Sequence, residues 1–240
     1  MRGRRRELIF DGGRADVRRR CAGGILPAAD PAAEAVERMT EPSILNPLAV
    51  ADLQADLVAR WKRSLDSGPE AEGFLAVVAE QHRANFDLWN REDQARRRDV
   101  ADSVIAEVKR AIDGLNQRRN DLVETMDDML LSELSRRRIV PGPGAEQFSE
   151  TPGSMIDRLS ILALKVYHMN LQAERTDAGA EHVAKCAGKR DVLIEQRGDL
   201  TACLSRLLVR IESGAAVLKV YRQFKMYNDP NLNPALYDRG

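Results

Sequence analysis

The chain has 240 residues, of which 43% are hydrophobic and 31% are charged, which allows one large domain with a buried core. Its 37 basic and 37 acidic side chains cancel, which argues against a dedicated nucleic-acid-binding protein, because such proteins usually carry a basic excess. Three cysteines without metal-ligand spacing favour a reducing cytoplasm over a disulfide framework, and no apolar run approaches the roughly 18 to 20 residues that span a bilayer.

Residues 1–38 are rich in Arg, Gly, Ala and Pro and show no sustained periodicity. The stretch ELIFDGG is too short and too charged to be the apolar core of a signal peptide. We therefore expect residues 1–38 to be either a disordered extension or the product of an over-long gene model. Residues 39–240 are expected to form a single all-α domain.

Apolar residues then recur at helical spacing and predict three successive helices. The first runs from Pro47 to about residue 65, with Asn46 as its N-cap, and the second spans about 69–97. The third ends near residue 136, with Asp99 or Asp102 expected as its N-cap.

The second and third helices carry polar side chains on or beside their apolar faces. The inward face of the second helix carries polar side chains around Trp89, where core residues would be expected: His82, Asn85, Glu92, Asp93 and Arg96. The third helix has a polar stripe at a spacing of four, three and four residues, with Arg119 on the other flank: Lys109, Asp113, Asn116 and Asn120. Two interpretations remain open, a binding site and a hydrogen-bond network that fixes the helix register.

The loop over residues 136–154, rich in Pro and Gly, is predicted to be a lid or binding loop that leads into a central buried helix near 153–170. Apolar residues cover about two-thirds of this helix's circumference. The remaining arc carries Asp157, Arg158, Lys165 and His168. Charges in apolar surroundings are costly unless they are paired, so partners are expected on other helices.

A fifth helix is predicted over about 178–212, and Arg197, centred in its apolar face, is expected to pair with a carboxylate. A last helical stretch is predicted over 215–228, where Tyr221 and Lys225 combine aromatic and basic groups. Such groups can stack bases, but packing of a C-terminal tail onto the bundle is the favoured interpretation. The predicted fold is an all-α bundle of about six helices with a polar cluster in its core.

Four blocks carry a resemblance to a known family: NFDLWNREDQAR (85–96), VKRAIDGLNQRRNDLVE (108–124), TPGSMIDRLSILALKVYHM (151–169) and QFKMYNDPNLNP (223–234). Together they resemble the bacterial family of domain of unknown function 4254. The family brings no established activity. Similar proteins tend to be encoded near glycosyltransferases, so the resemblance implies a cytoplasmic accessory role in envelope glycan metabolism.

The first functional hypothesis is a site for a phosphorylated small molecule, such as a sugar phosphate or a nucleotide sugar. Candidate residues for proton transfer or for holding a hard cation such as Mg²⁺ are His82, Glu92, Asp93, Asp113, Asp157 and His168. Candidate ligand-binding residues are Asn85, Trp89, Arg96, Lys109, Asn116, Arg119, Asn120, Arg158, Lys165, Arg197 and Lys225. These polar residues are expected to converge into one buried or cleft-lining cluster.

Two other hypotheses remain. One is a non-catalytic helical scaffold or accessory subunit that packs on a glycosyltransferase or on a second copy of itself. The other is a Mg²⁺-dependent all-α pyrophosphohydrolase, which ranks last because the carboxylates are too dispersed for a tight ExxE cluster. The sequence shows no Gly-rich phosphate loop, nucleophile elbow, HExxH or CxxC motif, so it leaves open whether the protein is an enzyme.

Overall fold

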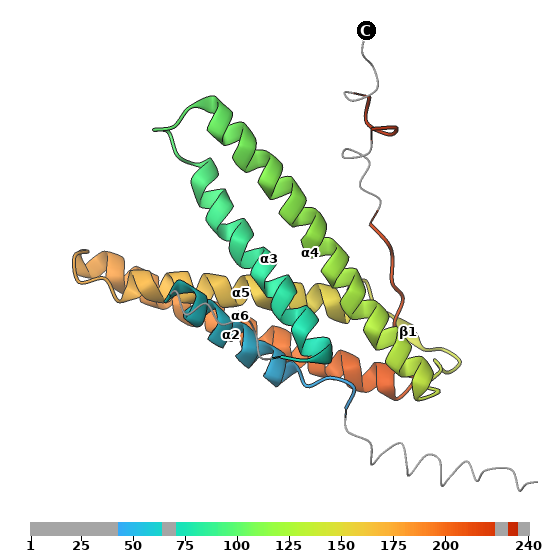
Figure 1. The fold of residues 1–240 in the computed structure, drawn as a ribbon. Helices are drawn as coiled ribbons and strands as arrows, with labels where there is room; N and C mark the ends of the chain where they lie inside the picture. Colours follow the sequence, from blue (N-terminus) through green and yellow to red (C-terminus); the bar gives the residue numbers. More distant parts are fainter. Residues whose placement is uncertain (1–42, 64–70, 224–229, 235–240) are drawn as a thin grey trace, which may run out of the picture. The chain divides into compact units, whose positions relative to one another are not determined.

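The computed structural model describes residues 43–63, 71–223 and 230–234. In these ranges it has five helices and two short strands (Figure 1), which confirms the all-α prediction. The helices are α2 (Pro47–Lys62), α3 (Gly73–Ala95), α4 (Asp102–Arg136), α5 (Pro152–Ala173) and α6 (Ala180–Glu212). The expectation for residues 1–38 and the candidate Lys225 lie outside the described residues. Of the described helices, none is long and apolar enough to cross a membrane.

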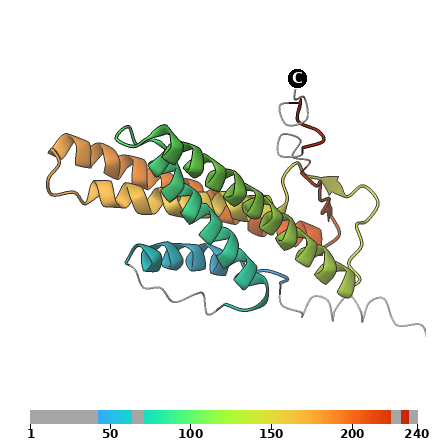
Figure 2. The same cartoon turned by 45° about the horizontal axis from the view of Figure 1, so that its top comes forward.

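Helix α5 is central, as predicted, because it packs against each of the other four described helices. Helices α3 and α4 form one antiparallel hairpin, and α5 and α6 form a second (Figure 1). The first hairpin crosses α5 at an angle and extends beyond it, which both views show (Figure 2). Helix α2 packs along the seam between α5 and α6.

The main hydrophobic core surrounds the first half of α5. Ile156 and Leu159 of α5, Met126 of α4 and Leu204 of α6 have no exposed surface. Burial of each such side chain stabilises the fold by about 1.5–3 kcal/mol. Along each helix the buried apolar residues recur every three or four positions, which explains why these segments fold as amphipathic helices.

The start of α5 is held by a carboxylate of α4. The backbone N–H of Gly153 donates to Oδ1 of Asp127 at 2.7 Å, while the Thr151 hydroxyl accepts the N–H of Ser154 at 3.2 Å. These bonds satisfy N–H groups that have no partner inside the helix, and the carboxylate faces the positive end of the helix dipole. Burial raises the pKa of Asp127, and the bonds from Thr151 and Gly153 oppose that rise.

The sequence-based prediction of a helix over 215–228 is wrong for residues 215–223. Gly214, with φ of +73°, ends α6 in the left-handed region, and the chain then forms β2 (Ala216–Val217). This strand pairs in parallel with β1 (Glu146–Gln147), and the N–H of Glu146 also donates to the carbonyl of Ala215 at 2.9 Å. The short apolar run after Gly214 fits a strand as well as a helix, and the neighbouring loop decides between them.

The predicted N-caps of α4 are also wrong. Ala101 occupies the cap position without a side-chain bond, and Asp102 is the first helical residue. Asp99 instead pairs with Arg97, at 2.6 Å between the closest atoms, and stabilises the turn before the helix.

Replacement of Gly153 by Ala should destabilise the fold by about 1–3 kcal/mol, the usual cost of overpacking. A Cβ at this position would lie 2.6 Å from the carbonyl oxygen of Val123 and 2.9 Å from the Asp127 carboxylate, so backbone of α4 would have to move. Gly198→Ala is the matched control, because a Cβ there meets nothing within 4 Å. Urea unfolding should show Gly198→Ala unchanged or more stable; equal losses in both variants would contradict this account of the α4–α5 contact.

Candidate functional site

Side chains of α3, α4 and α5 form a buried hydrogen-bonded group, here called the polar cluster: Gln81, His82, Asn85, Arg119, Asp157 and Ser160. Asp157 of α5 is its centre. Its Oδ1 accepts from Gln81 Nε2 at 2.5 Å, from Asn85 Nδ2 at 3.0 Å and from Arg119 Nε at 2.7 Å. Arg119 also donates from Nη2 to Oδ2 of Asp157.

The Asp157 carboxylate therefore has four donors from two other helices. An ionised carboxylate offers about four acceptor positions, so its hydrogen-bonding capacity is filled. The bond to Asp157 raises the pKa of Arg119, which keeps the guanidinium charged. Arg119 and Asp157 neutralise each other's charge, so the pair needs no further ligand.

A second branch of the polar cluster leads from Asn85 to His82. Asn85 Nδ2 donates to Ser160 Oγ at 2.9 Å, and Ser160 Oγ lies 2.7 Å from His82 Nδ1. Because Asn85 occupies an acceptor position of the hydroxyl, we assign the Ser160 proton to the bond with His82 Nδ1. Ser160 and His82 have no exposed surface, so this serine–histidine pair is not accessible to a substrate in the structure.

The pKa of His82 is lowered from 6.5 to about 3, chiefly by burial; the backbone bond with Gln54 opposes this, and the charge of Arg197 contributes to the lowering. The imidazole stacks on Trp61 with ring centroids 5.2 Å apart. His82 is therefore neutral in the fold at neutral pH. Its role in the structure is that of a packed hydrogen-bonding partner.

Arg197 of α6 lies beside the polar cluster but does not pair as expected. Its guanidinium donates to the backbone carbonyl of Ala51 in α2. The prediction of a carboxylate partner is thus wrong, although the charge of Asp52 does oppose the lowering of the Arg197 pKa by burial. An arginine can satisfy a helix carbonyl because its planar fork projects N–H donors well beyond its own helix.

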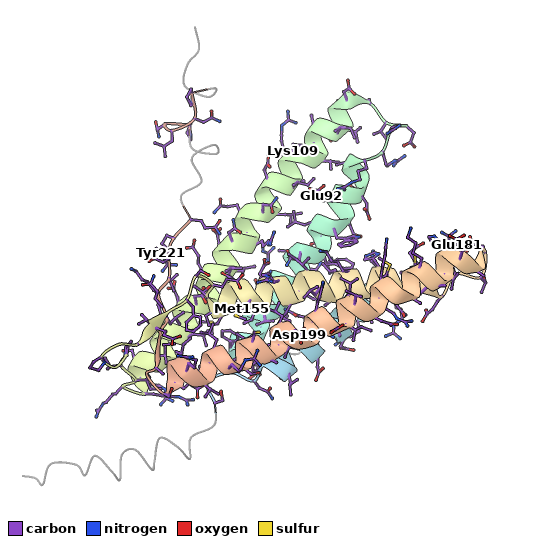
Figure 3. The ribbon with its side chains drawn as sticks, turned by 180° about the vertical axis from the view of Figure 1, so that it is seen from behind. Glu92, Lys109, Met155, Glu181, Asp199 and Tyr221 are labelled. Atoms are coloured by element: carbon purple, nitrogen blue, oxygen red, sulfur yellow. The ribbon has the colours of Figure 1, made fainter. Side chains whose placement is uncertain are left out.

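The expected convergence holds for four candidates, His82, Asn85, Arg119 and Asp157. Other candidates lie at or near the surface and pair away from the polar cluster: Glu92 with Arg96, Lys109 with Asp113, Asn120 with Gln223, and Arg158 with Glu150. Figure 3 shows Glu92 and Lys109 on the part of the α3–α4 hairpin that extends away from α5. The hairpin crosses α5, so the polar stripes meet α5 at the crossing and diverge from it elsewhere.

Five more candidates lie outside the polar cluster. Trp89 and His168 stack with ring centroids 4.5 Å apart and planes inclined by 8°, and burial lowers the pKa of His168. Asp93 is exposed and opposes that lowering. Asn116 is half-buried on α4, and Lys165 is exposed on α5.

Sequence reasoning missed five of the buried polar residues, among them Asp127 and Thr201. Gln81 and Ser160 belong to the polar cluster, and Gln54 of α2 donates to the backbone carbonyl of Ile156 at 3.1 Å. Ser160 lies three residues after Asp157, one helical turn along the same face, so its spacing was an available signal. Among the described residues, no three His, Cys, Asp or Glu side chains gather as a set of metal ligands.

A surface groove follows the seam between α5 and α6 on a different side of α5. Three adjoining hollows of about 360, 570 and 570 Å³ form this α5–α6 groove. The first two share Met155 and Cys203, and the last two share Lys165 and Gln196, so the hollows are continuous. Figure 3 looks toward this side, with Met155 of α5 and Asp199 of α6 labelled.

The α5 wall of the groove is a single helical stripe, with members three or four residues apart: Met155, Arg158, Leu162, Lys165 and Met169. Phe148 and Glu150 of the loop before α5 close one end. Arg158 and Lys165, predicted to bind a ligand, thus lie in this groove and not in the polar cluster. The loop predicted to be a lid or binding loop forms part of its wall.

Asp157→Asn should destabilise the protein by about 3 kcal/mol, because it leaves the partly buried Arg119 without a charged partner and places an amide N–H₂ among donors. Asp113→Asn, which removes an exposed carboxylate paired with Lys109, should leave stability nearly unchanged. Urea unfolding of both variants tests this. A small loss in Asp157→Asn would show that the polar cluster does not hold the helices together.

Folding stability should fall as pH is lowered from 6.5 toward 5. The folded-state pKa of His82, about 3, is depressed below the unfolded value of 6.5, so in this range the unfolded chain binds a proton that the folded chain does not. The expected slope approaches about 1.4 kcal/mol per pH unit at its steepest. His82→Gln should flatten this part of a urea-unfolding profile; an unchanged slope would show that other groups cause it.

The comparisons with known proteins agree with the resemblance in the sequence. No curated protein and no solved structure matches the chain. One protein family does match, described as "Protein of unknown function (DUF4254)", over residues 75–220. This range contains α4, α5, α6 and all but the first two residues of α3, and therefore all of the polar cluster and the α5–α6 groove. The chain belongs to the DUF4254 family.

Proposed function

We propose that this protein is a non-catalytic helical binding module, an accessory subunit that receives a partner protein in the α5–α6 groove. The observation that supports this most directly is the position of the groove. Arg158, Lys165 and Met169 of its α5 stripe lie roughly 160° around the helix from Ile156 of the core, while Met155 and Leu162 at the base of the groove pack on the core. Helix α2 packs on α5 and α6 along one side of their seam, while the groove leaves the other side uncovered by described residues.

The polar cluster supports a structural role for the residues that first suggested chemistry. Asp157 is saturated by donors, and His82 and Ser160 have no exposed surface. A group of this kind fixes the relative positions of helices, because shifting any one of them would strand a buried charge or amide. In this proposal the polar cluster positions α5, and α5 presents the groove.

The family resemblance supplies the partner class for this proposal, a glycosyltransferase of envelope glycan synthesis. A second copy of the chain is the alternative partner. Both would use the same uncovered seam, and the two are distinguished by the composition of the complex.

A phosphorylated small molecule is the second candidate. Arg158, Lys165 and Gln196 line the middle hollow of about 570 Å³, which is large enough for a sugar phosphate or a nucleotide sugar. However, Arg158 already donates to both oxygens of Glu150, at 2.6 and 2.7 Å, so an anion would have to displace that carboxylate. This competition ranks small-molecule binding below partner binding.

The pyrophosphohydrolase hypothesis is the weakest. Its candidate carboxylates are separated, and three of the four are already paired: Asp157 with Arg119, Glu92 with Arg96, and Asp113 with Lys109. Cation pairing of this kind competes with Mg²⁺ for the same oxygens.

The proposal can be tested by crosslinking the partner from a residue that lines the groove. Cys203 is exposed there, so a photo-crosslinker attached to it in a Cys21→Ser/Cys186→Ala background would reach a bound partner. The control places the crosslinker at Ala106→Cys on the exposed side of α4, with Cys203 also replaced. We expect one polypeptide to be crosslinked from Cys203 and not from position 106, in the cells that naturally produce the chain.

The captured polypeptide, once purified, should form a complex of defined stoichiometry with the unmodified protein. Val192→Gln, in the groove, should weaken this complex by tenfold or more, whereas Val104→Gln on α4 should not; both valines are about half exposed, at 52% and 43%. A thermal-shift screen of nucleotide sugars and sugar phosphates runs in parallel. A saturable shift that Lys165→Met abolishes, without a stable protein complex, would replace the proposal by the second candidate.

A further inference from the structure

We infer that the occupant of the α5–α6 groove is an acidic amphipathic helix of the partner, recognised through Lys165, Lys185 and Lys189. This inference rests on the proposed function and adds the chemistry of the partner. It concerns the third hollow of the groove, at the end of the seam distant from Phe148.

The three lysines surround this hollow from both helices. Lys165 belongs to α5, and Lys185 and Lys189 belong to α6. All three are exposed, and none has a hydrogen-bond or ion-pair partner among the described residues. No acidic side chain lines the hollow. The rim therefore carries three positive charges, and the nearest groove carboxylate, Asp199, lines the adjoining middle hollow.

The floor between the lysines is apolar. It is formed by Met169 of α5 and by Val192 and Leu193 of α6, and Val192 is 52% exposed. A cationic rim around an apolar floor matches a surface that is itself amphipathic, with apolar residues in the middle and carboxylates on both flanks. Flexible methionine in the floor suits it to pack against side chains of varied shape.

The shape favours a helix over other acidic partners. The groove is a long channel between two antiparallel helices, and the protein already fills the opposite channel with a helix, α2. A third helix packed on two others is the ordinary way to cover such a seam. An anionic membrane surface is flat and would contact the lysine tips without filling the apolar floor.

The distal half of α6 packs on α5 but buries few of its own side chains. Of residues 180–199, Cys186 alone is buried, whereas six residues are buried in 200–211: Leu200, Thr201, Leu204, Leu207, Leu208 and Ile211. Leu171 and Ile194 are also exposed on this part of the hairpin, at 44% and 51%. Coverage by a partner helix would remove this apolar surface from water.

A second copy of the chain is a poorer occupant, because two grooves placed face to face would bring their lysines together. Like charges at such an interface oppose association. The complementary surface must therefore carry net negative charge, and an acidic helix supplies it with the periodicity that the seam requires.

The test uses a fluorescent three-heptad helical peptide with Leu at the a and d positions and Glu at e and g, and a matched peptide with Gln at e and g. Fluorescence anisotropy with the full-length protein should show saturable binding of the Glu peptide and weaker binding of the Gln peptide. The Lys165→Gln/Lys185→Gln/Lys189→Gln variant should bind the Glu peptide at least tenfold more weakly, and added salt should reduce the wild-type difference.

The control variant, Arg98→Gln/Lys109→Gln/Arg110→Gln, loses the same charge from the α3–α4 hairpin and should keep wild-type affinity. Equal affinity for both peptides, or no effect of the lysine substitutions, would overturn the inference while leaving an uncharged partner in the groove, and hence the proposed function, intact. Binding of neither peptide would also overturn it, and the crosslinking experiment would then decide the proposed function independently. Lysine-dependent binding to phosphatidylglycerol vesicles but not to the peptide would assign the rim to a lipid surface, and a lysine-dependent dimer in sedimentation would assign it to a second copy.

Discussion

The burial of one carboxylate constrains the arrangement of α3, α4 and α5. Asp157 lies in the central helix, where an unpaired charge would cost several kcal/mol, so donors must reach it from neighbouring helices. Gln81 and Asn85 arrive from α3 and Arg119 arrives from α4. Apolar packing alone would allow one helix to slide along another, but these hydrogen bonds can form only when the helices are in one register. These bonds thereby fix the position along α5, at Asp157, where the α3–α4 hairpin crosses it.

The amide of Asn85 shows how narrowly this arrangement is specified. Its two N–H groups are directed to two different acceptors, Asp157 and Ser160. A reversed amide would place its oxygen against both, so a single orientation satisfies the network. The cost of this specificity is a core with polar atoms at its centre, and the surrounding leucine and isoleucine residues of α5 and α6 compensate for it.

Much of the fold was predictable because helical periodicity is a strong local signal. The apolar spacing around Leu159 identified the central helix, and Pro47 marked the start of α2. Ala216 was misassigned because its state depends on pairing with Glu146, seventy residues earlier, which no local pattern reveals. In the site, the charge of Asp157 drew attention to the right helix face, but periodicity cannot state where two helices cross. Glu92 and Lys109 were therefore grouped with residues from which the crossing separates them.

The pairing of β1 with β2 ties the loop that closes one end of the groove to the segment that follows α6. Phe148 stands two residues after Glu146, beneath the guanidinium of Arg210 at 5.6 Å from its ring centre, while Gln147 donates to the Tyr221 hydroxyl at 3.1 Å. These contacts join the loop before α5, the end of α6 and the extended residues after α6 into one unit, here called the clasp. A load applied beyond Gln223 would thus act first on the bonds of Arg222 and Gln223 to Glu124 of α4, and then on the clasp at the mouth of the groove, before it reached the core.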